Sequence, residues 1–294
     1  MKVRELSHSI QPLVRQEFVV PNSHITFTAA CFEGDGWSLK PLQEMGDEKK
    51  HPEFAAQVGS ALAGLDVRHA YAPNPTAFNA KIIKPGNLQN IIPLPGGVFL
   101  CRNRSFPADG TVLSVSGDAG VFSAGGCGIV VMSYGRELAF AHAGRDCILD
   151  RTWIETRGRE RGRDRISVVD TMLDFLDVPV AHMDRVRAWP LFFIKPRDFI
   201  HRVDDKNEKH RSFNYGAVYM LPMHYGNWGG LVTNKGGPSE QIAINLPGIV
   251  FAQLRKRGVP EANINMEHSF VDDELPHTRN GDGRGRYLVA IVRQ

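Results

Sequence analysis

Apolar residues recur along this chain in two patterns, each typical of a different secondary structure. Short runs rich in β-branched and aromatic residues favour strands. These runs are Ile25–Ala30, Lys81–Ile83, Gly97–Cys101, Thr111–Val115, Ile129–Met132, Leu138–Ala141, Trp189–Ile194, Tyr215–Leu221, Ala262–Met266 and Arg286–Val292. The many prolines between residues 71 and 97 indicate that the elements there are short.

Other segments repeat apolar residues every three or four positions, as helices with one buried face do. They are Pro52–Leu65, Asp150–Leu176 and Ile242–Gly258. A proline in the first turn and a glycine at the end suit helix termini. Because strands and helices alternate without internal repeats, we expect a fold of the α/β (α+β) class. The prediction is one layered domain over residues 1–294, with a mixed β-sheet flanked by helices.

Composition narrows the classes of function. The 294 residues suffice for a large core, and 42% hydrophobic and 23% charged residues are ordinary for a soluble globular protein. A formal net charge of +3 is too small to indicate binding to nucleic acid or a membrane surface. The basic stretch Arg157–Arg165 contains acidic residues and no aromatic ones, so we interpret it as a solvated loop or helix end. No apolar run reaches the roughly 18 residues of a transmembrane helix.

The cysteines and the N-terminus bear on location. Cys31, Cys101, Cys127 and Cys147 are far apart and form no Cys-x-x-Cys pair. The segment Met1–Ser7 lacks the apolar core of a secretory signal. We therefore expect a reduced, cytoplasmic protein, with secretion that needs no cleaved signal left open.

A predicted hairpin connects the two most reactive side chains. Cys127 precedes the strand Ile129–Met132, and His142 follows the strand Leu138–Ala141, with a turn at Tyr134–Glu137. A hairpin brings its outer ends together, so these residues can meet although they are fifteen positions apart (127 to 142). The pair suits a thiolate nucleophile with a histidine base, or two ligands of a metal ion. A small buried cysteine with a hydrogen-bonded histidine is the third interpretation.

Several segments together resemble the laccase-domain proteins, the multicopper-type polyphenol oxidoreductases whose bacterial members include purine nucleoside phosphorylases. The resemblance rests on the order of an alanine–aspartate turn, a cysteine after small residues, and a His-Ala-Gly segment. The matching segments are Gly46-Asp47, Ala108–Ser114, Gly125–Cys127, His142–Cys147, Ile244–Ile264 and Glu274–Arg286. The resemblance implies the laccase-domain fold and, as one activity, metal-dependent phosphorolysis or deamination of a purine nucleoside.

The family's metal is zinc or copper, held by a His-Cys-His set, and the resemblance places Cys127 and His142 in two of the three positions. The first histidine of that set lies upstream of the alanine–aspartate turn. Residues 71–107 contain no histidine, and Phe78 stands at the corresponding place. A catalytic zinc site needs three protein ligands and an open position. The candidates for a third ligand are His69, Cys101 and His277.

The same segment also resembles the Cys–His glutamine deamidases, which share this fold and include the catalytic domains of cytotoxic necrotizing factor-like toxins. That resemblance implies Cys127 as nucleophile and His142 as base in an amide hydrolase that needs no cofactor. Backbone N–H groups at Gly126 and Gly128 would hold the oxyanion. A main-chain carbonyl of the Thr111–Ser114 strand is our prediction for the group that orients His142.

Further substrate contacts are expected near the histidine. Arg145 stands three residues after His142 and suits an anionic or carbonyl group, or else a surface salt bridge with Asp146 or Asp150. His277 and Arg279 are weaker candidates from the C-terminal motif. Three classes of function remain: a Cys–His hydrolase of a small amide or a protein glutamine, a metal-dependent nucleoside enzyme, and a binding protein without activity. The sequence does not determine the oligomeric state.

Overall fold

The computed structural model of the protein describes residues 12, 14–21, 23–32, 51–75, 80–88, 90–102, 107–159, 167–226, 230–234, 241–271 and 287–294. The described strands form three sheets, of seven, five and three strands. The seven-stranded sheet has the order β1-β2-β15-β8-β3-β6-β5. Its members are β1 (Val14–Val19), β2 (Ile25–Cys31), β3 (His69–Tyr71), β5 (Asn90–Pro93), β6 (Phe99–Arg102), β8 (Asp118–Ala124) and β15 (Tyr287–Arg293).

The five-stranded sheet has the order β11-β9-β10-β7-β4, and the three-stranded sheet the order β12-β14-β13. Their members are β4 (Ile82–Ile83), β7 (Gly110–Leu113), β9 (Gly128–Tyr134), β10 (Glu137–Ala143), β11 (Arg187–Leu191), β12 (Ile200–Arg202), β13 (Val232–Asn234) and β14 (Gln241–Ile244). Strand β3 is parallel to β6 and β8, and β4 is parallel to β7, whereas the other pairs are antiparallel. The mixed α/β architecture predicted from the sequence is therefore confirmed.

The helices cover the sheets from outside. They are α2 (His51–Leu62), α3 (Arg145–Ile148), α4 (Arg151–Glu155), α5 (Val168–Phe175), α6 (Glu208–Tyr225) and α7 (Leu246–Lys256), with 3₁₀ turns η1 (Pro85–Asn87), η2 (Pro95–Gly97), η3 (Val180–Arg185) and η4 (Glu261–Asn263). None of the helices in the described ranges is long and apolar enough to cross a membrane.

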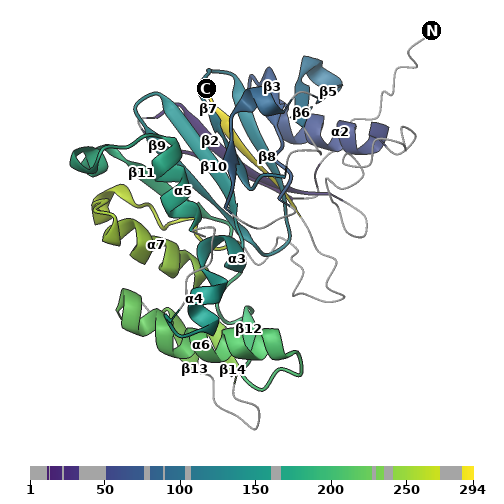
Figure 1. The fold of residues 1–294 in the computed structure, drawn as a ribbon. Coiled ribbons are helices and arrows are strands. Elements are labelled where there is room, and N and C mark those ends of the chain that lie inside the picture. The colour runs from purple at the N-terminus through teal and green to yellow at the C-terminus, as the bar shows by residue number, and fades with distance from the viewer. Residues whose placement is uncertain are drawn as a thin grey trace.

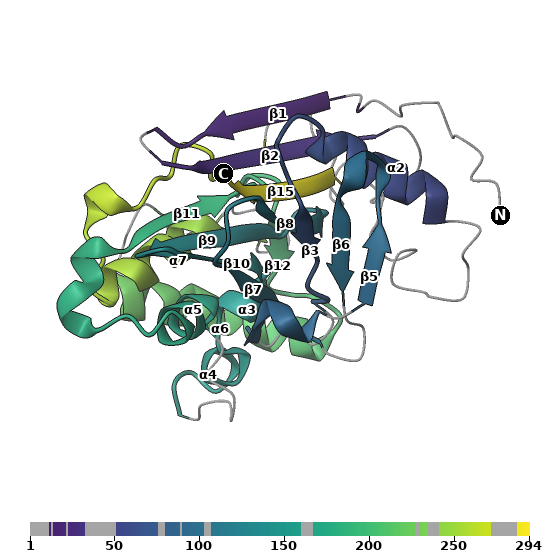
Figure 2. The ribbon, with the colours of Figure 1, turned by 90° about the horizontal axis from the view of Figure 1, so that it is seen from above.

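The core lies between the two large sheets, which face each other (Figures 1 and 2). Strand β15 alternates between two cores: Val289 and Ile291 face the five-stranded sheet, and Leu288 and Ala290 pack under α2. This alternation follows from the two-residue period of a strand. On the other side, α5 and α7 contact strands of the five-stranded sheet. Helices α4 and α6 lie farther out with the three-stranded sheet (Figure 1).

The strand predicted at Tyr215–Leu221 is wrong. Residues 215–221 belong to α6, an 18-residue helix, although their tyrosines and valine favour a strand. The helix buries Phe213, Ala217 and Leu221 at intervals of four residues, and Tyr215 and Tyr219 lie exposed. Burial of this helical stripe outweighs the local preference.

Two further boundaries also differ from the prediction. The segment predicted as one helix, Ile242–Gly258, contains strand β14 and then α7. The break occurs at Asn245, whose side chain accepts the N–H of Gly248 as an N-cap. The predicted strand Ala262–Met266 is instead the turn η4 with an isolated bridge from Ile264 to Ala188.

Candidate active site

Three neighbouring strands deliver three functional side chains to one end of the five-stranded sheet. Cys127 directly precedes β9, His142 is the next-to-last residue of β10, and Asp109 directly precedes β7. Strand β10 lies between the other two, with Ala143 opposite Gly128 and Ala141 opposite Gly110. The predicted hairpin is confirmed, and it brings the two ends that carry Cys127 and His142 together.

His142 contacts Cys127 on the pocket side of its ring. A hydrogen bond between the two side chains contributes to the raised pKa of His142. The space between them depends on Gly144: a Cβ added there would lie 3.2 Å from Nε2 of His142 and 3.4 Å from Sγ of Cys127. Because it would also approach Cε1 to 2.7 Å, a side chain at this position would wedge against the pair.

On the other side of the ring, Asp109 orients His142. Its Oδ1 lies 3.6 Å from Nδ1 of His142, and its Oδ2 accepts the N–H of Lys81 at 3.2 Å. The main-chain carbonyl of Asp109 also accepts the N–H of His142, at 2.8 Å. The orienting group is thus the Asp109 side chain, two residues before the Thr111–Ser114 segment whose main-chain carbonyl we predicted for this role. The alanine–aspartate turn was the available signal, because aspartate in such a turn is an acceptor at a strand end.

Cys147 closes this side of the ring. Its Sγ lies 3.4 Å from both Nδ1 of His142 and Oδ1 of Asp109. The thiol is fully buried, and burial raises its pKa; contact with His142 opposes this rise in part, and Asp109 adds to it. Both acceptors on this side favour a proton on Nδ1, which leaves Nε2 as the nitrogen that can exchange a proton with Cys127.

The electrostatics of His142 oppose its burial. Burial of the imidazole by itself lowers the pKa, and it is the largest single effect. Hydrogen bonding to Asp109, Cys127 and Cys147 together outweighs burial, so the pKa lies well above the usual value of 6.5. These contacts therefore favour the imidazolium, as a neighbouring thiolate would.

The Cys127 side of the ring opens into a pocket of about 480 Å³. Helix α3 supplies Arg145, strand β12 supplies His201, and the N-terminal half of α6 supplies His210 and Asn214. Arg145 therefore lies at the predicted mouth, with its guanidinium 4.4 Å from the ring centre of Phe213 and Nε 3.4 Å from Asp146. Arg145 therefore lines the pocket and also pairs with Asp146, so the two roles expected from the sequence do not exclude each other. The polar character of residues 201–214 was visible in the sequence, but its position opposite Cys127 depends on the tertiary fold.

The turn that carries Cys127 is held from behind. Gly126 and Gly128 are both buried; the Gly126 carbonyl accepts the N–H of Ile194 at 3.3 Å. The ring of Phe193 packs on Gly128 so closely that a Cβ there would lie 2.4 Å from it. Neither glycine lines the pocket as described, whereas Cys127 and Gly144 do. The oxyanion role of these glycines stays a prediction.

A buried tyrosine supports the same segment. The hydroxyl of Tyr287 donates to the carbonyl of Phe192 at 2.7 Å, and the side chain is fully buried. Phe192 has a left-handed backbone with φ of 59°, which is costly for a residue with a side chain. Burial, and next the charge of Cys127, raise the pKa of Tyr287. Tyr287 therefore lies close enough to sense the thiolate and anchors the strained turn behind it.

The other predicted residues are not part of this site in the described structure. His277 and Arg279, with the Gly46-Asp47 segment, lie outside the described residues. His69 and Cys101 belong to the seven-stranded sheet, where His69 contacts Asp118 at 3.5 Å. In the described part of the chain, the single group of three or more potential metal ligands is Asp109, His142 and Cys147, whose ligand atoms lie within 4.8 Å of one another. This buried group could hold a metal ion, but it uses Cys147 instead of the predicted Cys127.

The fold is that of the laccase-domain proteins, as the sequence motifs predicted. The chain is similar to the hypothetical protein YfiH of Bacillus licheniformis, with 14% identity, 92% of this chain and 93% of that one covered, and a TM-score of 0.60. Its similarity to the DUF152 protein NMB0706 of Neisseria meningitidis has 15% identity, coverage of 95% and 99%, and a TM-score of 0.61. The chain is also similar to YlmD of Geobacillus stearothermophilus, with 16% identity, 92% of this chain and 91% of that one covered, and a TM-score of 0.59. No protein-family model and no curated protein matches the sequence.

Proposed function

We propose that the protein is a cysteine hydrolase that cleaves an amide C–N bond, with deamidation of a glutamine side chain as the specific reaction. The observation that carries the proposal is the position of His142, held by Asp109 at Nδ1 and hydrogen-bonded to Cys127 at the wall of an open pocket. A nucleophile, a base and a group that orients the base are the parts that acyl transfer requires.

The chemistry follows from these roles. The Cys127 thiol gives its proton to His142, and the thiolate attacks the carbonyl carbon of the amide. The resulting tetrahedral oxyanion collapses as its C–N bond breaks, and the imidazolium gives its proton to the leaving nitrogen, which departs as ammonia. Water, deprotonated by His142, then attacks the thioester, and the C–S bond breaks to leave a carboxylate and to restore the thiol. Asp109 keeps Nδ1 protonated throughout, so Nε2 performs both proton transfers.

Arg145 is the proposed substrate-binding cation. Its guanidinium stacks on Phe213 beside the pocket and has 16% side-chain exposure, so it is held in place while its edge remains accessible. Such an arginine suits a carboxylate or carbonyl group of a protein or small-molecule amide. Replacement by alanine should raise KM more than it lowers kcat.

A metal-dependent nucleoside enzyme is the second candidate, and the buried Asp109, His142 and Cys147 group is the observation that favours it. These residues fit a catalytic metal poorly. Asp109 is 1% exposed and Cys147 is fully buried, so a metal among them would have no position open to a substrate. The raised pKa of the Cys147 thiol also opposes the thiolate form that binds metal. Cys127, which does face the pocket, belongs to no such group within the described residues.

The first experiment measures metal content and the rate of alkylation of Cys127 by iodoacetamide on the same preparation. We expect rapid alkylation that slows at least about tenfold in His142→Ala, independent of chelator, followed by ammonia release from glutamine-containing peptides. Cys31→Ala is the matched control, because this buried thiol belongs to the seven-stranded sheet. One zinc or copper ion per chain that is lost in both Cys127→Ala and His142→Ala would overturn the metal-free mechanism. A wild-type Cys127 that does not react would exclude the hydrolase.

A further inference from the structure

A second pocket, of about 340 Å³, lies at the C-terminal end of α3, where Ile148, Leu149 and Asp150 line it. Helix α3 contributes to both pockets: Arg145 and Asp146 at its start line the first, and Ile148 at its end lines the second. The two pockets share no lining residue in the described part of the chain. The volume of the second pocket is at the lower end of the ~300–1,000 Å³ typical of small-molecule sites. This space therefore needs its own explanation.

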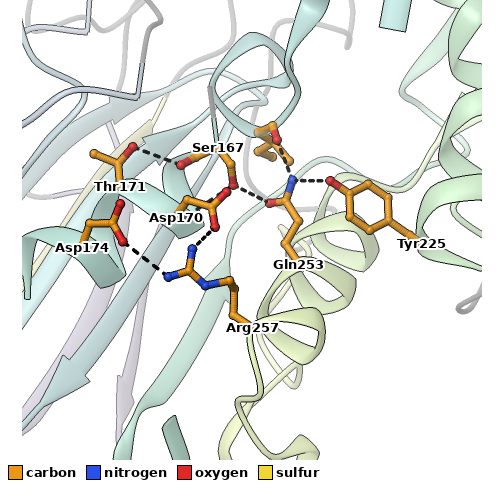
Figure 3. A network of polar contacts seen from close by, with 8 residues as sticks. Ser167, Asp170, Thr171, Asp174, Tyr225, Gln253 and Arg257 are labelled. Atoms are coloured by element: carbon orange, nitrogen blue, oxygen red, sulfur yellow. Dashed lines mark hydrogen bonds and ion pairs between the residues drawn. The ribbon is translucent and has the colours of Figure 1, made fainter. Parts of the chain in front are cut away.

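The inner wall of the second pocket is a fixed polar network (Figure 3). Gln253 of α7 is 6% exposed; its Nε2 donates to the carbonyl of Ile148 at 2.7 Å and to the hydroxyl of Tyr225 at 3.0 Å. Its Oε1 accepts the hydroxyl of Ser167 at 3.2 Å. One buried amide thus connects α3, α5, α6 and α7, and a pocket built on such a network is pre-organised.

The side wall is aromatic. The ring of His224 lies in edge contact with Trp153, at 4.6 Å between centres, and with Tyr225, at 4.7 Å. All three residues are half-buried and line the pocket. Partly accessible aromatic rings in a cavity favour a ligand with a flat ring, because stacked and edge-on contacts add to the area that is buried.

The lining carries two carboxylates, Asp150 and Asp170, and two cations, and Lys256 is the cation without an ion pair to a described residue. Arg257 is already engaged by Asp170 and Asp174, and Asp150 accepts the N–H of Trp153 as a helix cap. Lys256 differs: its Nζ lies 2.8 Å from Nε2 of His224 and 5.7 Å from the centre of the Tyr225 ring. No carboxylate of the described residues lies within ion-pair distance of it.

We propose that this pocket binds a small organic anion with one planar aromatic ring. The ring would lie against Trp153 and Tyr225, and the anionic group would reach Lys256. The site does not depend on the proposed hydrolase activity, since none of its residues belongs to the Cys127, His142 and Asp109 set. A ligand here would contact the C-terminal end of α3, whose first residue, Arg145, lines the other pocket.

The test uses benzoate, salicylate and 2-naphthoate, measured by isothermal titration calorimetry on the full chain. We expect saturable binding of one ligand per chain, weaker for the uncharged benzamide and for acetate, which lacks the ring. Lys256→Met should weaken binding about tenfold, the size expected for one charge-assisted hydrogen bond. Lys84→Met is the matched control, since this exposed lysine lies outside the pocket.

Two further variants locate the ligand. Trp153→Leu should weaken the binding of the aromatic acids without changing their preference over the uncharged benzamide. Thermal unfolding checks that each variant folds. Arg145→Ala separates this pocket from the active site. The proposal is overturned if none of the three acids binds saturably at about 10 mM. It is also overturned if Arg145→Ala weakens binding and Lys256→Met does not, because the anion would then lie beside Cys127.

Discussion

Two thiols face the same imidazole from opposite sides, and their surroundings differ. Cys127 lies at the wall of an open pocket, half-buried, and hydrogen-bonds to His142. Cys147 contacts the Nδ1 side of the ring, fully buried, beside Asp109. The residue types are identical, so access and electrostatics must assign their roles. This difference supports our proposal that Cys127 reacts on one face of His142 while Cys147 and Asp109 hold the other face.

The largest predicted effect separates the two thiols. Iodoacetamide should modify Cys127 about a hundredfold faster than Cys147, because Cys147 is inaccessible and its burial raises its pKa. Cys127→Ala should abolish activity and change the free energy of unfolding by less than ~0.5 kcal/mol. Cys147→Ala should retain activity and cost about 1–2 kcal/mol, the loss of a buried, hydrogen-bonded side chain. Mass spectrometry and urea unfolding measure both. Faster modification of Cys147 would contradict the assignment.

Asp109→Asn should remove the support without removing the nucleophile. Activity should fall about a hundredfold or more, because the amide no longer favours a proton on Nδ1. The pKa of His142 should fall as well, since burial would then be less opposed. Titration of the His142 ring by NMR measures this shift. An unchanged pKa would show that Asp109 does not hold the imidazole.

The raised pKa of His142 also makes the stability of the wild-type protein depend on pH. The folded-state pKa of His142 is raised above its value of 6.5, so protonated His142 contributes stability that is complete below pH 6.5. This contribution is lost as the pH rises through the raised value. The free energies of unfolding of wild type and Asp109→Asn, measured in urea, should therefore differ more at pH 6 than at a pH above the raised pKa of His142.

The smallest predicted effect concerns the turn behind Cys127. Tyr287→Phe leaves the buried carbonyl of Phe192 without this hydroxyl and should cost about 1–2 kcal/mol, with slower alkylation of Cys127. Tyr134→Phe is the matched control, because its hydroxyl contacts His182 at 2.7 Å at the opposite end of β9. Equal alkylation rates in the two variants would show that the strained turn at Phe192 does not position the nucleophile.

The sequence predicted the parts of this site that local pattern determines. The Cys127 and His142 hairpin follows from two apolar runs around a turn, and the laccase-domain fold follows from the spacing of small motifs. Asp109 was part of a recognised motif, but its role depends on β7 lying beside β10, a contact between strands separated by 25 residues or so in the chain. Local pattern does not encode such pairings.

The errors have a similar cause. Residues 215–221 contain aromatic and β-branched side chains that favour a strand, and only the packing of Phe213, Ala217 and Leu221 against the rest of the core makes them helical. The start of α7 was missed because its cap, Asn245, follows a buried strand whose apolar residues continue the helical pattern. Strand β8, which the prediction lacked, has one glycine and two alanines, which give a weak strand signal.

The turn of the β9–β10 hairpin is a suitable site for inserting a peptide tag. It lies at Gly135 and Arg136, the end farthest from Cys127, and seven-residue strands separate the two ends by about 23 Å. Because strand pairing fixes the register between the ends, a short peptide tag inserted in this turn would leave the alignment of Cys127 with His142 unchanged. The protein could thus be labelled, immobilised or fused to a reporter through the same hairpin that carries its chemistry.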